Sequence, residues 1–173
     1  MRSWRQAWLL MATAAVSWGT PVVAQENEGQ RALVIEAANL MAGDAHHQAL
    51  AERGGDANAL YPGDVIHYRL VFTNITDVAV RRIELNDPLP LGLRYVGGSA
   101  LVDRDDVVIS YSIDGGQVYS AQPMIEDVVD GERVTRPAPP EMYTHIRWMV
   151  PGWVQPGAQV TAEFRAQLAK PAR

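Results

Sequence analysis

The chain contains 173 residues, of which 47% are hydrophobic, and its formal net charge is −5. This length is enough for one domain with a substantial core and argues against two domains. The chain has no cysteine, which excludes a structural disulfide, a lipidated cysteine, a zinc site built from thiolates and a cysteine nucleophile.

Residues 1–24 have the layout of a secretory signal peptide. Arg2 and Arg5 precede an apolar run over residues 7–16, and Val22 and Ala24 occupy the two positions where a signal peptidase requires small side chains. We expect cleavage after Ala24. An uncleaved anchor helix is the alternative, but a membrane span needs ~20 apolar residues and this run is about half as long.

Export without disulfides is typical of a bacterial envelope or extracellular protein. We therefore expect the mature chain in the periplasm, at the cell surface or outside the cell, with no membrane-spanning segment after cleavage. Cleavage would remove two arginines and no acidic residue, which changes the net charge from −5 to −7. A domain this acidic is a poor nucleic-acid binder.

The region between the signal peptide and the main domain, residues 25–60, is predicted to hold one strand and a long connection. The imperfect alternation within residues 31–41 predicts a first strand, with a helical turn as the alternative. Residues 42–59 are rich in alanine, glycine and aspartate, and we expect a loosely packed connection in which residues 48–53 form one or two helical turns.

The main β-domain is predicted over residues 61–173. Ile66, Tyr68, Leu70 and Phe72 lie two residues apart, which indicates a strand with one buried face. The Pro-Gly-Asp sequence at residues 62–64 supplies the turn before this strand.

Further short strands follow, separated by glycine and proline turns. We expect single strands around Ile83 and Leu85 and at residues 93–96, 107–113, 144–150 and 160–168. We also expect a hairpin within residues 124–135 that turns at Asp130 and Gly131, followed by an extended crossing over residues 136–140. About seven short strands with turns every 8–12 residues or so predict an all-β fold, and we expect an immunoglobulin-like Greek-key β-sandwich. Trp148 is the candidate for its buried tryptophan.

The turn and strand motifs also carry a resemblance to a known family. They are Pro62-Gly63-Asp64, Ile66, Tyr68, Asn74, residues 87–96 (DPLPLGLRYV), 112–116 (SIDGG), 144–148 (THIRW) and the Pro-Gly pair at 156–157. Over residues 61–170 the chain resembles the conserved-repeat domain of unknown function number eleven, found in bacterial exported and surface proteins. The resemblance implies an immunoglobulin-type sandwich and transfers no catalytic residues. With one copy of the domain, the chain is similar to short, signal-bearing, single-domain members from Gram-negative bacteria.

The four histidines are the candidates for a histidine metal site. Such a site needs three of them, or two and a carboxylate, close together in space. His67 and His145 fall on outward-facing strand positions, whereas His46 and His47 fall in a predicted loop. We therefore expect solvated imidazoles and no metal site.

The acidic loops and one tryptophan are the candidates for ligand binding. Calcium prefers oxygen ligands clustered on a loop, and the dense carboxylates are Asp103, Asp105 and Asp106 together with Glu126, Asp127 and Asp130. Their spacing does not match a twelve-residue calcium loop, so solvation is the simpler explanation. Trp153 lies in a predicted turn, where it could stack on a sugar or a partner, or cap the open end of the sandwich.

The sequence contains no Gly-x-Ser-x-Gly elbow and no phosphate loop. We expect an exported, non-enzymatic β-sandwich with an interaction or envelope-structural role, no cofactor, and a protein or other envelope component as its partner. Binding would use loops or an exposed sheet edge, where a partner segment can add as a strand. The alternatives are a carbohydrate- or calcium-binding accessory of an envelope enzyme and a periplasmic assembly chaperone.

Overall fold

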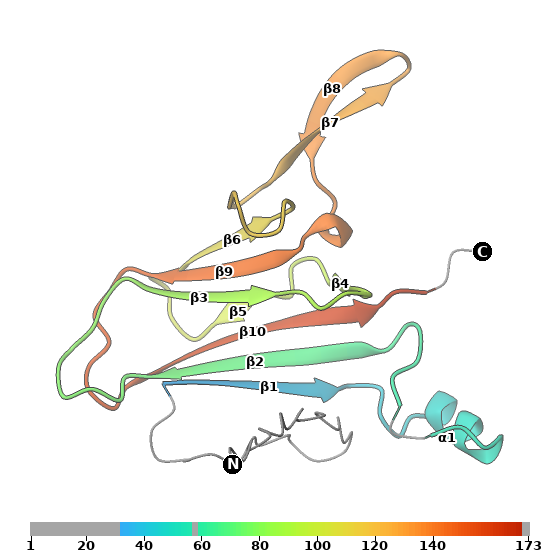
Figure 1. Cartoon of the computed structure of the whole chain (residues 1–173), viewed down its shortest axis with the longest axis horizontal. Coiled ribbons are helices and arrows are strands. Elements are labelled where there is room, and N and C mark those ends of the chain that lie inside the picture. Colours follow the sequence, from blue (N-terminus) through green and yellow to red (C-terminus); the bar gives the residue numbers. More distant parts are fainter. Residues whose placement is uncertain (1–31, 57–58, 171–173) are drawn as a thin grey trace, which may run out of the picture.

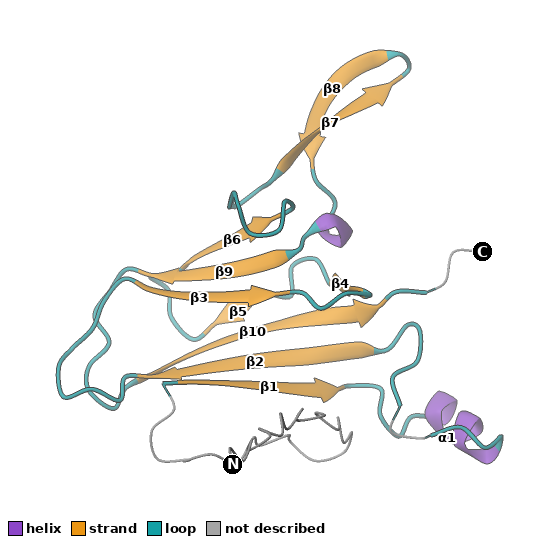
Figure 2. Ribbon diagram, viewed as in Figure 1, coloured by secondary structure: helices purple, strands orange, loops and turns teal. Residues whose placement is uncertain are grey.

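The computed structural model of the protein describes residues 32–56 and 59–170. The predicted signal peptide and its cleavage site lie outside the described residues. Antiparallel strands dominate the described chain, which confirms the all-β class (Figure 2). No helix in these residues is long and apolar enough to span a membrane.

The larger sheet has five strands and includes the first and last strands of the described chain. β1 (Leu33–Asn39) pairs with β2 (Val65–Thr73), and β2 pairs with β10 (Gln159–Leu168). Two short strands, β4 (Leu93–Tyr95) and β5 (Leu101–Val102), pair with the other side of β10. β1 is therefore an edge strand, and it runs along the lower side of the molecule in Figure 1.

The smaller sheet has three strands in the order β3 (Ile83–Pro88), β9 (His145–Val150) and β6 (Val108–Ser112). A short helix, η1 (Pro140–Met142), precedes β9. β3 ends at Pro88, where proline removes a backbone donor.

The core lies between the two sheets and follows the period-two patterns of the sequence. Leu70 and Phe164 from the larger sheet and Ile146, Trp148 and Val150 from the smaller sheet are fully buried. The rings of Trp148 and Phe164 lie 5.9 Å apart between centroids. The prediction that Trp148 is buried in the core is confirmed.

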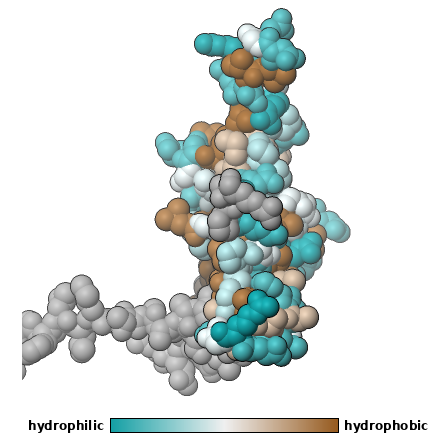
Figure 3. Space-filling model, turned by 90° about the vertical axis from the view of Figure 1, so that its right-hand side faces the viewer, coloured by the Kyte–Doolittle hydropathy of each residue, from teal (hydrophilic) through white to brown (hydrophobic). Residues whose placement is uncertain are grey.

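A hairpin projects from the body of the molecule (Figure 1). Its strands are β7 (Met124–Val129) and β8 (Glu132–Pro137). Asp130 and Gly131 have φ angles of 54° and 85°, the left-handed conformations that a tight hairpin turn requires, so the predicted hairpin is confirmed. The exposed apolar side chains of the hairpin include Met124 at its start and Val128 and Val129 near its tip. Figure 3 shows hydrophobic residues in brown among hydrophilic ones on the hairpin at the top of the molecule.

Two expectations about the chain path are wrong. Arg136 and Pro137 belong to β8 rather than to an extended crossing, which a hairpin accommodates because neither of its strands is central. The described residues form ten strands rather than about seven, since the hairpin contributes two strands and β5 was not expected.

Within residues 42–56 the predicted helical turns are confirmed, but they begin earlier than expected and one side chain packs closely. Helix α1 (Ala45–Glu52) lies there, with Asp44 as its N-cap accepting a hydrogen bond from the His47 N–H at 2.9 Å. His47 is 0% exposed. The segment is therefore attached to the body of the protein by one fully buried polar side chain.

Candidate functional site

β1 presents an open hydrogen-bonding edge. The Thr73 N–H donates to the Ala32 carbonyl at 2.8 Å, and in an antiparallel pair with this register alternate residues bond to the neighbouring strand. The even-numbered residues of β1 therefore bond to β2. The N–H and C=O groups of Leu33, Ile35 and Ala37 point away from the sheet, and in the described part of the chain no strand pairs with that side.

Both faces of β1 expose aliphatic side chains. Leu33 and Ile35 lie on the inner face, in register with Phe72 and Leu70 of β2, yet they are 40% and 49% exposed. Val34 lies on the outer face and is 39% exposed. The inner side chains remain exposed because β1 packs beside β2 and the three-stranded sheet does not extend over it. We call Leu33, Val34, Ile35, Glu36 and Ala37 the β1 edge surface.

A row of charges crosses the outer face of the larger sheet and ends at this edge. Arg69 of β2 lies in register with Glu36 of β1 on one side and with Glu163 of β10 on the other. Its guanidinium is 3.5 Å from the Glu36 carboxylate and 3.4 Å from the Glu163 carboxylate. Two carboxylates thus share one arginine, and Glu163 also contacts His67 at 3.3 Å.

A buried polar cluster fixes the end of β1. The Asp64 carboxylate, at the start of β2, accepts hydrogen bonds from Asn39 Nδ2 at 2.9 Å and from the Tyr61 N–H at 3.0 Å, and His47 Nε2 lies 2.9 Å from its Oδ2. Burial raises the pKa of the Asp64 carboxyl, but the hydrogen bonds from Tyr61, His47 and Asn39 outweigh burial, and the pKa is lowered from its ordinary value. The cluster therefore holds the carboxyl end of β1 and helix α1 against β2.

The structure brings Trp153 and Asp106 together in the loops at one end of the two sheets. Trp153 is 56% exposed, and the Arg81 guanidinium lies 4.9 Å from the centre of its ring. Arg104 donates to the Trp153 carbonyl at 3.4 Å and to both carboxylate oxygens of Asp106 at 2.7 and 2.8 Å. The exposure of Trp153 fits a surface contact better than a cap, and Asp106 is engaged by an arginine.

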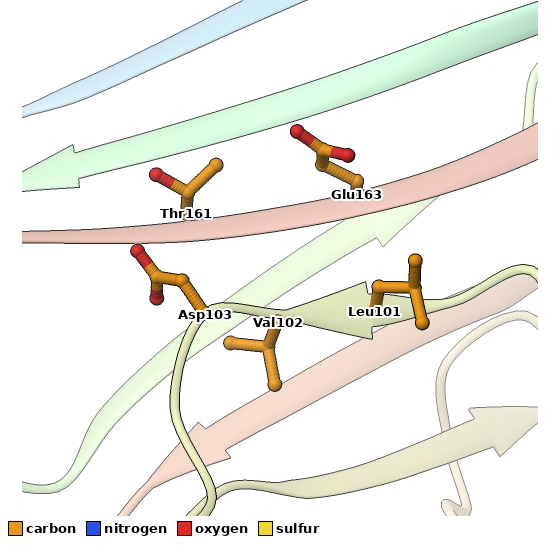
Figure 4. Close-up of a pocket in the computed structure, with 5 residues that line it drawn as sticks. All are labelled: Leu101, Val102, Asp103, Thr161 and Glu163. Atoms are coloured by element: carbon orange, nitrogen blue, oxygen red, sulfur yellow. The ribbon is translucent and has the colours of Figure 1, made fainter.

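Asp103 and Asp105 lie apart from that pair. Asp103 lines a shallow hollow of about 210 Å³ on the outer face of the larger sheet, beside Thr161 and Glu163 (Figure 4). Its N–H donates to the Thr161 carbonyl at 3.0 Å. Asp105 is exposed in the following loop.

The acidic residues do not assemble a calcium site. Glu126, Asp127 and Asp130 lie in or at the turn of the projecting hairpin, where Asp127 pairs with Arg136 at 2.6 Å. Within residues 32–56 and 59–170, no group of three or more histidine, aspartate or glutamate side chains is placed to hold a metal ion.

His46 and His47 are adjacent on α1, whereas His67 lies on β2 and His145 on β9. His46 is exposed, His67 pairs with Glu163, and the His145 ring lies 6.5 Å from the Tyr119 ring. The expectation that His47 is solvated is wrong, because the side chain is buried against Asp64.

A second buried carboxyl lies between the sheets. Asp87 of β3 is 7% exposed, and among the described residues its Oδ2 atom and the Trp148 Nε1 atom are buried without a hydrogen-bond partner. Burial raises the pKa of Asp87 to about 6. The nearby Tyr68 phenol also has a raised pKa, because of its burial and then of the Asp87 charge.

From the sequence we expected binding through loops or an exposed sheet edge, but the sequence did not show which strand lies at that edge. Strand order depends on contacts between distant segments, so neither the open side of β1 nor the row of charges is readable from residues 33–39 alone. One local signal exists, since consecutive aliphatic residues at 33–35 put apolar side chains on both faces of a strand. No family model, no curated protein and no solved structure matches this chain.

Proposed function

We propose that this protein is an exported, non-enzymatic interaction module that binds an extended segment of a partner protein by strand addition to β1. The observation that supports the proposal is the open side of β1, where the backbone groups of Leu33, Ile35 and Ala37 have no neighbouring strand in the described residues. An added strand would pair with these groups, and exposed side chains on both faces would give it specificity.

The composition of β1 supports this role. Soluble proteins commonly protect an edge strand by making it short, by placing lysine or proline in it, or by adding a bulge. β1 is seven residues long, contains neither lysine nor proline, and pairs with β2 in an unbroken register. The β1 edge surface has one charged side chain, Glu36, and aliphatic residues around it.

The proposal places the module in a bacterial envelope. Export rests on the signal-peptide layout of residues 1–24. We assign the module to an immunoglobulin-like Greek-key arrangement and to the conserved-repeat domain of unknown function number eleven on the motifs of residues 61–170. An assembly chaperone that holds subunit segments at β1 would be one form of this activity.

Carbohydrate binding is the second candidate, because Trp153 is 56% exposed in the loop between β9 and β10. This loop lies at the end of the molecule opposite to α1 (Figure 1). Exposed aromatic rings stack on sugars. The Arg81 guanidinium lies over the Trp153 ring, so a bound sugar would have to use the other face of the ring or displace Arg81. Glycan binding that is lost in Trp153→Ala and kept in Ile35→Lys would favour this role over strand addition.

Site-specific photo-crosslinking in cells that produce the protein tests the first candidate. A photo-reactive residue replaces Ile35 in one variant and, as a control, Val118 in another, since Val118 is an exposed aliphatic residue beyond the far edge of the smaller sheet. We expect a crosslink from position 35 to one protein, within a segment that mass spectrometry maps as continuous, and no such product from position 118. Equal products from both positions, or none from position 35, would contradict the proposal.

Two further variants separate binding from folding. The Ile35 N–H points away from β2, so Ile35→Pro removes a donor from the open side and leaves the β1–β2 hydrogen bonds in place. Ile35→Lys introduces a charge on the same surface. We expect both to abolish the crosslink to the partner from a photo-reactive residue at Leu33, while the protein continues to be exported and folded.

A further inference from the structure

The row of charges on the larger sheet ends in an incompletely neutralised carboxylate. Glu163, Arg69 and Glu36 lie side by side on three adjacent strands, and their signs alternate. Arg69 is 3.5 Å from Glu36 and 3.4 Å from Glu163, so its single charge serves both carboxylates. The side chain of Glu36 is 48% exposed.

An added strand would place one of its residues directly opposite Glu36. The backbone N–H and C=O groups of Glu36 bond to β2. In a pair between β1 and an added antiparallel strand, Glu36 would therefore occupy a non-hydrogen-bonded position. Side chains that face each other in such a position approach most closely. Opposite charges in this position are stabilising and like charges are destabilising. The residues on either side of that position would turn to the inner face, beside the exposed Ile35 and the adjacent Ala37.

We infer that the segment that adds to β1 carries a lysine or arginine opposite Glu36, with an apolar residue immediately before and after it. This inference rests on the proposed function and specifies its partner. The basic residue would continue the alternating negative and positive charges of Glu163, Arg69 and Glu36 onto one more strand. The two apolar residues cover the part of the inner face that the smaller sheet leaves exposed.

A second copy of β1 does not meet this requirement. In an antiparallel pair of two β1 strands that uses the outward groups, the residue opposite Glu36 is an even-numbered residue of the other copy. In β1 and the residue on either side of it, these are Ala32, Val34, Glu36, Ala38 and Leu40. None is basic, so the charge pattern favours a different chain as the occupant.

Two synthetic peptides with blocked ends test the inference. TVTVKVTVT alternates apolar and polar residues, with its lysine on the polar face, and TVTVEVTVT carries glutamate instead. Each is titrated to millimolar concentration into the isotopically labelled mature protein, and backbone amide shifts of β1 report binding. We expect the lysine peptide to bind about fivefold more tightly than the glutamate peptide, since one cross-strand charge pair changes from repulsive to attractive.

Charge substitutions provide the matched comparison. Glu36→Gln should remove the preference between the peptides, and Glu36→Arg should reverse it. Glu84→Gln is the control, because Glu84 also lies beside an arginine, with Arg147 at 3.6 Å, but on the other sheet, and we expect it to keep the lysine preference.

The outcomes separate the inference from the proposed function. Equal binding of both peptides at the β1 amides would overturn the charge requirement and leave strand addition standing. A preference for lysine that persists in Glu36→Gln would also overturn it, because the selectivity would arise elsewhere. If neither peptide shifts the β1 amides, strand addition itself is contradicted and the inference fails with it.

Discussion

His47 Nε2 lies 2.9 Å from Oδ2 and 3.0 Å from Oδ1 of Asp64, and both side chains are almost completely buried. This contact joins helix α1 to the first residue before β2, and the Asn39 hydrogen bond to the same carboxylate adds the end of β1. The geometry of the edge strand therefore depends on one carboxylate outside it.

Asp64→Ala should destabilise the protein by about 3 kcal/mol, because it removes the buried carboxylate that His47, Asn39 and the Tyr61 N–H share. Urea unfolding measures the loss. Asp127→Ala is the control: Asp127 pairs with Arg136 on the exposed hairpin, where an ion pair contributes little to stability. Equal losses in the two variants would show that the buried cluster does not anchor α1 and β1.

The Asp87 carboxyl should make stability fall as pH rises. Its folded-state pKa is raised to about 6, above the ordinary value of about 3.9 in the unfolded chain, so the folded state binds the proton more tightly between these values. This contribution to stability is fully present below about pH 3.9 and is lost as pH rises through about 6. The free energy of unfolding should fall by about 3 kcal/mol at most.

Asp87→Asn removes this charge and tests the assignment. The variant should be more stable than the parent protein at about pH 8 and close to it at about pH 4, because only the parent buries a carboxylate at high pH. Urea unfolding of both proteins across this range gives the difference directly. A difference that does not vary with pH would show that Asp87 keeps an ordinary pKa in the folded state.

Asn74 links the two loops at the Trp153 end of the molecule. Its Nδ2 donates to the Val78 and Val154 carbonyls at 2.8 and 2.9 Å, and its Oδ1 accepts from the Thr76 N–H and hydroxyl at 3.1 and 2.7 Å. Asn74→Ala should cost about 2 kcal/mol, because it removes the hydrogen bonds that a buried side chain makes to both loops.

The control for this variant is Asn86→Ala, since Asn86 is exposed and accepts one hydrogen bond, from Arg147 at 2.9 Å. We expect it to change the free energy of unfolding by less than about 0.5 kcal/mol. If the two alanine variants lose similar stability, the Asn74 hydrogen bonds do not hold these loops together.

The strands were predictable from the sequence wherever one face is buried against the other sheet. Ile66 and Leu70 on β2 and Ile146 and Trp148 on β9 are each buried, as their spacing of two or four residues indicated. Alternation is a local signal because a strand turns successive side chains to opposite faces. The hairpin turn is also a local signal, because Asp130 and Gly131 are residue types that accept the positive φ angles of a tight turn.

The polar contacts were not predictable in this way. His47 and Asp64 are separated by 17 residues, and neither lies in an apolar periodic pattern that would mark a buried position. The row formed by Glu36, Arg69 and Glu163 requires the strand order and register of three segments distant in sequence. Such pairings depend on loop closure and on the competition between alternative registers, which no short window of sequence contains.

Amide hydrogen exchange in β1 of the free mature protein tests the open edge most directly. We predict slow exchange for Val34 and Glu36, whose N–H groups bond to β2, and fast exchange for Ile35 and Ala37, whose N–H groups point away from the sheet. This alternation would establish that the side of β1 is available to an added strand. Equal protection of all four amides would show that another segment or another copy already covers the edge, and would contradict the proposed mode of binding.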